Sequence, residues 1–68
     1  MEWDRLKTFY YVAKAGSFTK ASEFLNISQS AISRSVATLE DRLGARLFER
    51  FARGVVLTQQ GEIMFESV

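Results

Sequence analysis

The stretch Ala21–Leu43, ASEFLNISQSAISRSVATLEDRL, decides the fold because it reads as two amphipathic helices joined by a tight turn at Asn26–Ser28. The second helix carries short polar and basic side chains on most of its surface. Its apolar residues recur at helical spacing and fall on one narrow stripe: Ile32, Val36, Leu39 and Leu43. The pattern predicts a helix-turn-helix unit over about residues 21–40.

The ends of the helices are marked by residues suited to capping and chain reversal. Ser17 and Ser28 each precede an apolar-periodic segment and are good N-cap residues. Asn26 tolerates the left-handed conformation that a turn needs, and Gly44 is suited to end the third helix. An earlier helix is predicted over about Asp4–Ala15, because apolar residues there recur at the spacing of one helical face.

Beyond the third helix the pattern changes from helical to β-favouring. The short apolar runs Leu47-Phe48 and Val55–Leu57 flank the dipeptide Arg53-Gly54. This arrangement predicts a β-hairpin with its turn at that dipeptide.

A final helix is predicted after the hairpin. Thr58 is suited to cap it, and apolar residues recur from there to the end of the sequence. The predicted fold class is mainly α, of the winged helix-turn-helix type, in which residues 1–58 form a three-helix core and a small β-hairpin wing. Residues 59–68 form the start of a C-terminal helix.

Composition excludes several classes of function. The chain has 68 residues, a net charge of +1 and neither cysteine nor histidine, so it offers no disulfide framework, thiolate nucleophile or usual set of zinc ligands. It has no glycine-rich phosphate loop and no convincing pair of catalytic carboxylates, so we expect no enzyme activity, cofactor or metal. No apolar run approaches the ~18 residues of a membrane span, and the N-terminus lacks the apolar segment of a signal peptide. A cytoplasmic location is expected.

The aromatic side chains raise the question of base stacking, which proteins that bind single-stranded nucleic acid use. These residues fall largely on the predicted apolar stripes, so packing in the core is the stronger interpretation. The aromatic residues concerned are Trp3, Phe9, Phe18, Phe24, Phe48 and Phe65.

The exposed start of the third helix has the side chains that DNA recognition requires. A helix of its predicted length spans about 22 Å, and a major groove ~12 Å wide admits it with its first turns nearest the bases. Gln29 is suited to bond adenine, and Arg34 to bond guanine or a phosphate. Each neighbouring serine, taken singly, is a cap or a solvated group, but beside Gln29 and Arg34 we interpret the serines as contacts: Ser28, Ser30 and Ser33.

Basic side chains elsewhere extend the predicted contact surface. Arg53, at the turn of the hairpin, is the candidate for a contact with the minor groove or a phosphate, and Arg50 supports it. For Arg50, an ion pair with Glu49 or Asp41 is an equally good alternative. Two residues at the start of the second helix suit phosphate contacts, and one on the third helix lies at the fringe: Thr19, Lys20 and Thr38.

The segment FYYVAKAGSFTKASEFLNISQSAISRSVATLEDRLGARLFERFARGVVLTQQGE resembles the N-terminal DNA-binding domain of LysR-type bacterial transcriptional regulators. The resemblance spans about positions 4–62. Its most specific motifs are GSFTKAS, SQSAIS, LEDRLGARLFER and RGVVLTQQGE. The molybdate-responsive regulators of the ModE type carry a similar domain and are the alternative family.

The resemblance implies sequence-specific binding of double-stranded DNA and regulation of transcription, with the third helix in the major groove and the wing on the minor groove or backbone. In the family, the last helix lengthens into a linker that pairs with its counterpart. This implies a homodimer on a pseudo-palindromic site, with half-sites about 34 Å apart. A small-molecule effector would act through a further domain that these 68 residues do not contain. The predicted dimerisation residues are Ile63, Phe65 and Val68.

Some positions depart from the usual residues of the family. Ser30 stands where the family usually has proline, Ser22 where it has alanine, and Phe51 where it tends to have a polar residue. We expect Ser30 to loosen the first turn of its helix slightly. The alternative function is a winged-helix protein-interaction module that does not bind DNA. The arginine bias and the polar first turns argue against it, because interface centres favour aromatic and large apolar groups.

Overall fold

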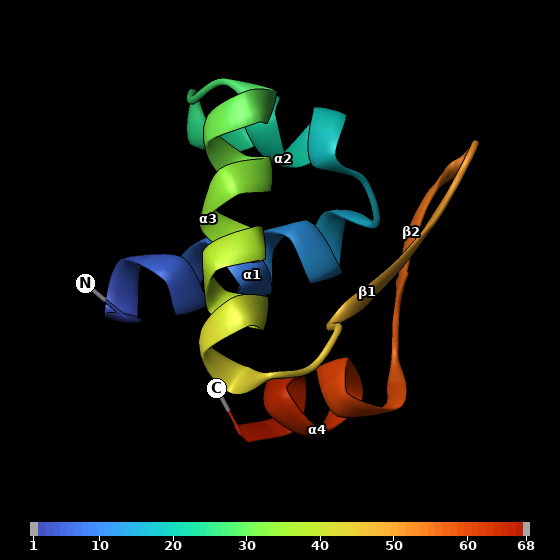
Figure 1. Ribbon diagram of the computed structural model, residues 1–68. Coiled ribbons are helices and arrows are strands. Elements are labelled where there is room, and N and C mark those ends of the chain that lie inside the picture. Colours follow the sequence, from blue (N-terminus) through green and yellow to red (C-terminus); the bar gives the residue numbers. More distant parts are fainter. Residues whose placement is uncertain (1, 68) are drawn as a thin grey trace.

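The computed structural model describes residues 2–67 (Figure 1). Within this part of the chain, three helices are followed by a hairpin and a final helix, as predicted. The bounds are α1 Glu2–Ala15, α2 Phe18–Leu25, α3 Gln29–Leu43, β1 Phe48–Phe51, β2 Gly54–Leu57 and α4 Gln59–Ser67. The winged helix-turn-helix architecture is confirmed, with α1 beginning at Glu2 rather than near Asp4. None of the helices between residues 2 and 67 has the length and apolar character that crossing a membrane requires.

The predicted caps and reversals are present at the helix ends. Each predicted capping hydroxyl accepts a backbone N–H from three residues further on, at 3.0–3.2 Å: Ser17, Ser28 and Thr58. Asn26 follows α2 in the left-handed conformation, with φ of 60°, and Gly44 follows α3 with φ of 70°. These residues let the chain reverse sharply, and α2 and α3 therefore form the predicted helix-turn-helix.

The core lies where α1, α2 and α3 meet the start of the hairpin. Leu47 and Phe48 close it from the side of the hairpin. The ring centroids of Phe9 and Phe48 lie 5.3 Å apart, so α1 packs directly on β1. The buried apolar residues are Phe9, Val12, Ala21, Ile32, Val36, Leu39, Leu47 and Phe48.

The apolar pattern was wrong about burial at Leu43, Trp3 and Phe24, whose exposed fractions are 46%, 63% and 71%. Leu43 is the last residue of α3 and Trp3 lies in the first turn of α1, where each helix extends past their crossing (Figure 1). Phe24 contacts the ring of Tyr11, with centroids 5.1 Å apart, and most of its surface remains uncovered. The other four aromatic residues assigned to the core pack in or against it, as predicted.

The wing is an antiparallel hairpin that is anchored to the turn between α1 and α2. Its register places Phe51 opposite Gly54. The N–H of Val55 donates to the carbonyl oxygen of Gly16 at 3.0 Å. A Cβ on Gly54 would collide with that carbonyl, and Gly54 also has φ of 151°. Glycine is therefore required where the hairpin passes this turn.

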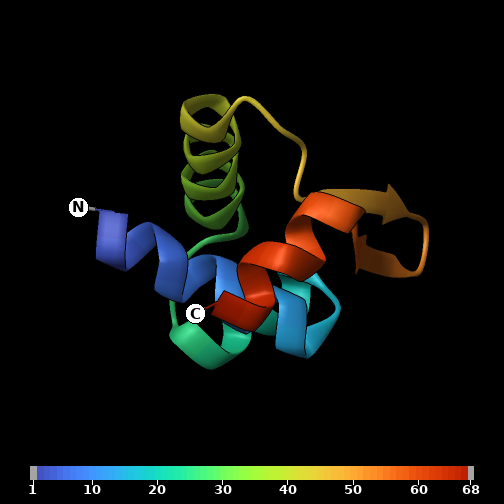
Figure 2. The same cartoon turned by 90° about the horizontal axis from the view of Figure 1, so that it is seen from below.

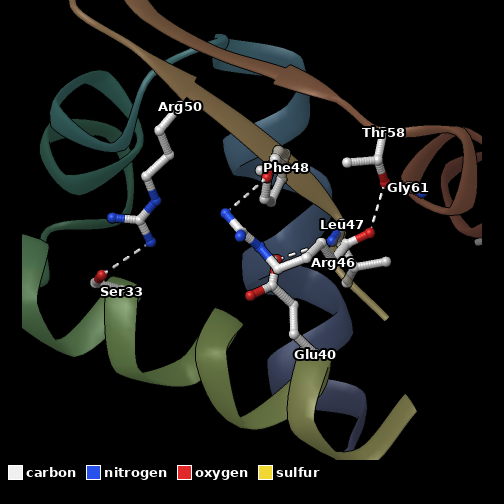
Figure 3. A network of polar contacts seen from close by, with 8 residues as sticks. All are labelled: Ser33, Glu40, Arg46, Leu47, Phe48, Arg50, Thr58 and Gly61. Atoms are coloured by element: carbon white, nitrogen blue, oxygen red, sulfur yellow. Dashed lines mark hydrogen bonds and ion pairs between the residues drawn. The ribbon is translucent and has the colours of Figure 1, made fainter. Parts of the chain in front are cut away.

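The base of the wing is fixed by hydrogen bonds to α3 and to the start of α4 (Figure 3). The carboxylate of Glu40 accepts the N–H of Leu47 at 2.8 Å. The hydroxyl of Thr58 donates to the carbonyl oxygen of Arg46 at 2.6 Å, and the N–H of Thr58 donates to the carbonyl oxygen of Leu47 at 3.0 Å. These bonds set the angle at which the hairpin leaves the helical core.

The start of the third helix and the wing tip lie at the opposite end of the molecule from the last helix. In Figure 1, α2, the first turns of α3 and the tip of the wing are at the top, and α4 is at the bottom. Seen from below, α4 runs beside α1 and the wing projects to one side (Figure 2). The rings of Tyr10 and Phe65 stack between α1 and α4, with centroids 5.1 Å apart and planes 13° apart.

Candidate nucleic-acid interface

The first turns of α3 lie at the end of the molecule that α2 and the wing tip share (Figure 1). They carry polar residues at most positions. Gln29, Ser30 and Arg34 are exposed, whereas Ser33 and Thr38 are half-buried. Because residues four apart share one helical face, Gln29 and Ser33 form one row. Ser30, Arg34 and Thr38 form the adjacent row. The predicted reading surface therefore has two neighbouring rows, and each row contains exposed and half-buried side chains.

Ser28 has a structural role at this helix start. Its Oγ accepts the N–H of Ala31 at 3.1 Å and lies 3.4 Å from the Oγ of Ser30. A hydroxyl can accept one hydrogen bond and donate another, so the cap leaves Ser28 able to donate to a phosphate.

A hollow of about 250 Å³ separates the wing from the starts of α2 and α3. Predicted contact residues from α2, α3 and the hairpin lie around it: Thr19, Gln29, Arg50 and Arg53. Its other lining residues are Ser17, Phe18, Phe51, Ala52, Gly54 and Val55. The two arginines and the hydroxyl of Thr19 give this hollow positive charge and hydrogen-bond donors, which are the groups that bind a DNA phosphate.

Arg50 connects the wing to both helices at this hollow. Its Nη2 donates to the Oγ of Ser33 at 3.2 Å (Figure 3). Its guanidinium carbon lies 4.3 Å from the ring centroid of Phe18. Within residues 2–67, these contacts take the place of the ion pair with Glu49 or Asp41 that was the alternative. Sequence reasoning assigned Phe18 to the core and missed this contact, because no spacing rule links a helix start to a distant strand.

The remaining predicted contacts lie in two other places. Lys20 lines a groove of about 420 Å³ between α1 and α2. Arg34 and Thr38 line a hollow of about 310 Å³ between α1 and α3. The structure therefore brings together the wing residues, Thr19 and Gln29, whereas Lys20 and Arg34 line two other hollows, each of which is bordered by α1.

The residues predicted to mediate dimerisation lie on α4 or beyond it. Ile63 is 58% exposed, whereas Phe65 is half-buried against Tyr10. Val68 lies outside the described residues. Pairing through this helix stays a prediction, with Ile63 as its most accessible apolar side chain on α4.

Known proteins resemble this chain in sequence and in fold. The family model described as bacterial regulatory helix-turn-helix protein, lysR family, matches residues 3–62. The transcriptional regulator TfdT of Cupriavidus pinatubonensis is 46% identical over 66 residues, which cover 97% of this chain and 29% of that regulator. The nitrogen assimilation regulatory protein nac of Escherichia coli is 45% identical over 65 residues, which cover 96% of this chain and 21% of that protein.

Solved structures of regulatory DNA-binding proteins match the fold of this chain. The DNA-binding domain of CbnR in its complex with DNA is 42% identical with a TM-score of 0.94, and the match covers 98% of this chain and 77% of that one. Full-length CbnR complexed with its target DNA matches at 42% identity with a TM-score of 0.94, over 98% of this chain and 23% of that one. The chain spans less than a third of the curated relatives named above. It belongs to the LysR family of bacterial regulatory helix-turn-helix proteins.

Proposed function

We propose that this chain is the DNA-binding part of a bacterial LysR-type transcriptional regulator and binds double-stranded DNA sequence-specifically. The observation that carries the proposal is the hollow between the wing and the helix starts, where Arg50 and Arg53 lie around the same space as Gln29. A phosphate held there by the arginines places the neighbouring base edges next to the first turn of α3. Contacts to phosphate then fix the register in which α3 reads bases.

Binding is non-covalent in this proposal, and each class of contact has its own role. Gln29 and Arg34 are the reading residues, because their side chains can form paired hydrogen bonds to adenine and guanine. Arg50, Arg53, Thr19 and Lys20 bind the backbone and supply affinity for any sequence. The N-terminal end of α3 adds its backbone N–H groups and its positive dipole to the attraction for phosphate.

We propose further that two copies bind together through a lengthened α4. This helix lies at the end of the molecule opposite the candidate interface (Figure 1), so pairing through it leaves both α3 helices free. A two-fold dimer then places its recognition helices in half-sites about one helical turn apart. Such a regulator acts in the bacterial cytoplasm and catalyses no reaction, and both statements are part of the proposal.

The experiment that tests this function is selection of bound sequences from a random duplex pool at a fixed, stated salt concentration. We expect enrichment of related half-sites in inverted orientation, about one turn apart, and weaker binding to scrambled duplexes. The double variant Gln29→Ala/Arg34→Ala should enrich nothing, whereas Lys7→Ala, on an exposed position of α1, should enrich the same sequences as the wild type. Equal binding to enriched and scrambled duplexes would exclude sequence-specific recognition and favour the protein-interaction alternative. Enrichment of single half-sites would exclude the paired arrangement alone.

A further inference from the structure

Phe51 is an apolar side chain at the wing tip that the fold leaves uncovered. It is the last residue of β1, and its exposed fraction is 61%. The register places it opposite Gly54, which has no side chain to cover the ring from β2. As the last residue before the turn, Phe51 lies at the edge between two hollows. It borders the hollow that Arg50 and Arg53 line, and it also lines a second hollow of about 490 Å³ together with Val56. An exposed ring at the edge of a basic recess has no role in the packing of the core.

The two faces of the wing differ in chemistry near its tip. Successive residues of a strand point to opposite faces. Arg50 points toward the helices, because its guanidinium contacts Phe18 and Ser33. Phe51 follows it directly in β1 and therefore lies on the opposite face, which it shares with Val56. The tip presents a basic group toward α3 and an apolar ring away from α3.

This division matches the two walls of a minor groove. The groove is about 6 Å wide and about 7.5 Å deep, so a hairpin tip that enters it lies between two sugar-phosphate walls. The face that carries Arg50 meets the wall nearer α3. The face that carries Phe51 meets the other wall, where the accessible surface includes the C–H groups of deoxyribose rings.

We propose that Phe51 packs against deoxyribose on the minor-groove wall remote from α3 and gives the wing an apolar component of its DNA affinity. This inference rests on the proposed function. It differs from the contacts assigned to Arg50 and Arg53 in its response to salt. Arginine contacts release counterions and weaken as salt rises, whereas burial of an apolar ring releases none.

The first measurement compares the affinity of the wild type and Phe51→Ser for the selected duplex over a range of salt concentrations. We expect Phe51→Ser to bind about 3- to 10-fold more weakly at every salt concentration, because part of a phenylalanine surface is no longer buried. The slope of log affinity against log salt should not change, because no charge is removed. Phe51→Leu should recover part of the lost affinity.

The matched control is Leu43→Ser at the end of α3. Leu43 is apolar and 46% exposed, and it lines neither of the hollows that Phe51 lines. The last turn of α3 lies away from the wing tip, toward α4 (Figure 1). Leu43→Ser should bind DNA as the wild type does. Thermal unfolding of Phe51→Ser close to that of the wild type should show that this substitution does not disturb the fold.

The second measurement locates the contact by hydroxyl-radical footprinting, which reports the accessibility of deoxyribose in the minor groove. At a protein concentration that saturates each complex, Phe51→Ser should restore cleavage at sugars of one strand beneath the wing. Leu43→Ser should leave the protection intact.

The outcomes separate this inference from the proposed function. If the wild type selects no duplex, the proposed function fails and this inference fails with it. If the wild type binds but Phe51→Ser has the same affinity and footprint, the inference alone is overturned. A change of salt slope in Phe51→Ser also overturns it, because the ring would then act through charged neighbours.

Discussion

The guanidinium of Arg50 lies over the ring of Phe18, with 4.3 Å between the guanidinium carbon and the ring centroid. The same group donates a hydrogen bond to Ser33, so one side chain connects β1 to the starts of two helices. The cation is thereby ordered beside the hollow before any DNA arrives. Ordering in advance reduces the side-chain entropy that binding must otherwise remove.

Substitution of Arg50 should separate its charge from its position. Arg50→Lys keeps the charge but lacks the planar group that stacks on Phe18 and reaches Ser33 together. We expect affinity for all duplexes to fall several-fold while the salt slope stays close to that of the wild type. Arg50→Ala should also lower the salt slope and reduce stability by about 0.5–1 kcal/mol. Salt titrations and urea unfolding measure both effects.

Phe18→Leu is the matching change on the partner residue. Leucine retains apolar volume but offers no ring face to the guanidinium, so the loss of affinity should resemble that of Arg50→Lys. If Arg50→Lys and Phe18→Leu both bind as the wild type does, the contact between them has no part in DNA binding.

Removal of Arg53 at the wing tip should affect every DNA sequence alike. Arg53→Ala removes one phosphate contact, so the salt slope should fall by about 0.9 units, and affinity for selected and scrambled duplexes should fall together. Titrations of both duplexes at several salt concentrations provide the measurement. Lys7→Ala serves as the charge-matched control and should leave the slope unchanged. An unaltered slope in Arg53→Ala would place this residue away from the DNA backbone.

Local signals in the sequence were sufficient to predict the elements and their order. Capping by Ser28 and the left-handed conformation of Asn26 depend on side chains within a few residues, and both are confirmed. Burial at helix ends was less predictable. Leu43 continues the apolar stripe of α3, but the helix has passed its crossing with α1 by that point.

The sequence predicted which residues belong to the candidate site, but it did not predict how they lie relative to one another. The hollow between Gln29 and Arg53 exists because hydrogen bonds fix the angle of the wing, including the bond from Val55 to Gly16. These bonds join segments far apart in the chain, and hydrophobic periodicity carries no information about them. The same limit explains why the contact of Arg50 with Phe18 was missed. It also explains why Lys20 and Thr19 were predicted to act together, although they line different hollows.

Loss of Arg34 should reduce discrimination between sequences more than affinity in general. We expect Arg34→Ala to weaken binding to the selected duplex by about 1–3 kcal/mol and to relax preference at one base pair. Binding to scrambled duplexes should weaken less. Arg46→Ala is the control, because Arg46 is 69% exposed at the base of the wing and pairs with Glu40 at 4.0 Å. Unchanged discrimination in Arg34→Ala would assign this residue to the backbone or to solvent.

Ser28 offers a test that separates folding from DNA binding at one position. Ser28→Ala should destabilise the protein by about 1 kcal/mol, because the N–H of Ala31 loses its capping oxygen. Ser28→Asp should keep stability close to that of the wild type, since aspartate is also a good N-cap residue. Its carboxylate would nevertheless face the DNA phosphates, so affinity should fall at low salt. Equal affinities of Ser28→Asp and the wild type would place this helix start away from the backbone.

Gly61 in α4 should not tolerate a methyl group, although alanine is normally the better helix former. Alanine gains up to about 1 kcal/mol over glycine inside a helix. A Cβ at Gly61, however, would collide with the carbonyl oxygen of Leu47 and lie 3.0 Å from the Cδ2 of Leu57. The carbonyl is backbone and also accepts the N–H of Thr58, so it cannot move without disturbing the base of the wing.

We expect Gly61→Ala to destabilise the protein by about 1–3 kcal/mol in urea unfolding, because overpacking outweighs the gain in helix propensity. Gln60→Ala, at an exposed neighbouring position, should change stability by less than about 0.5 kcal/mol. Stabilisation by Gly61→Ala would mean that α4 can move away from the hairpin at little energetic cost, and the close packing of these two elements would then not be what fixes the wing.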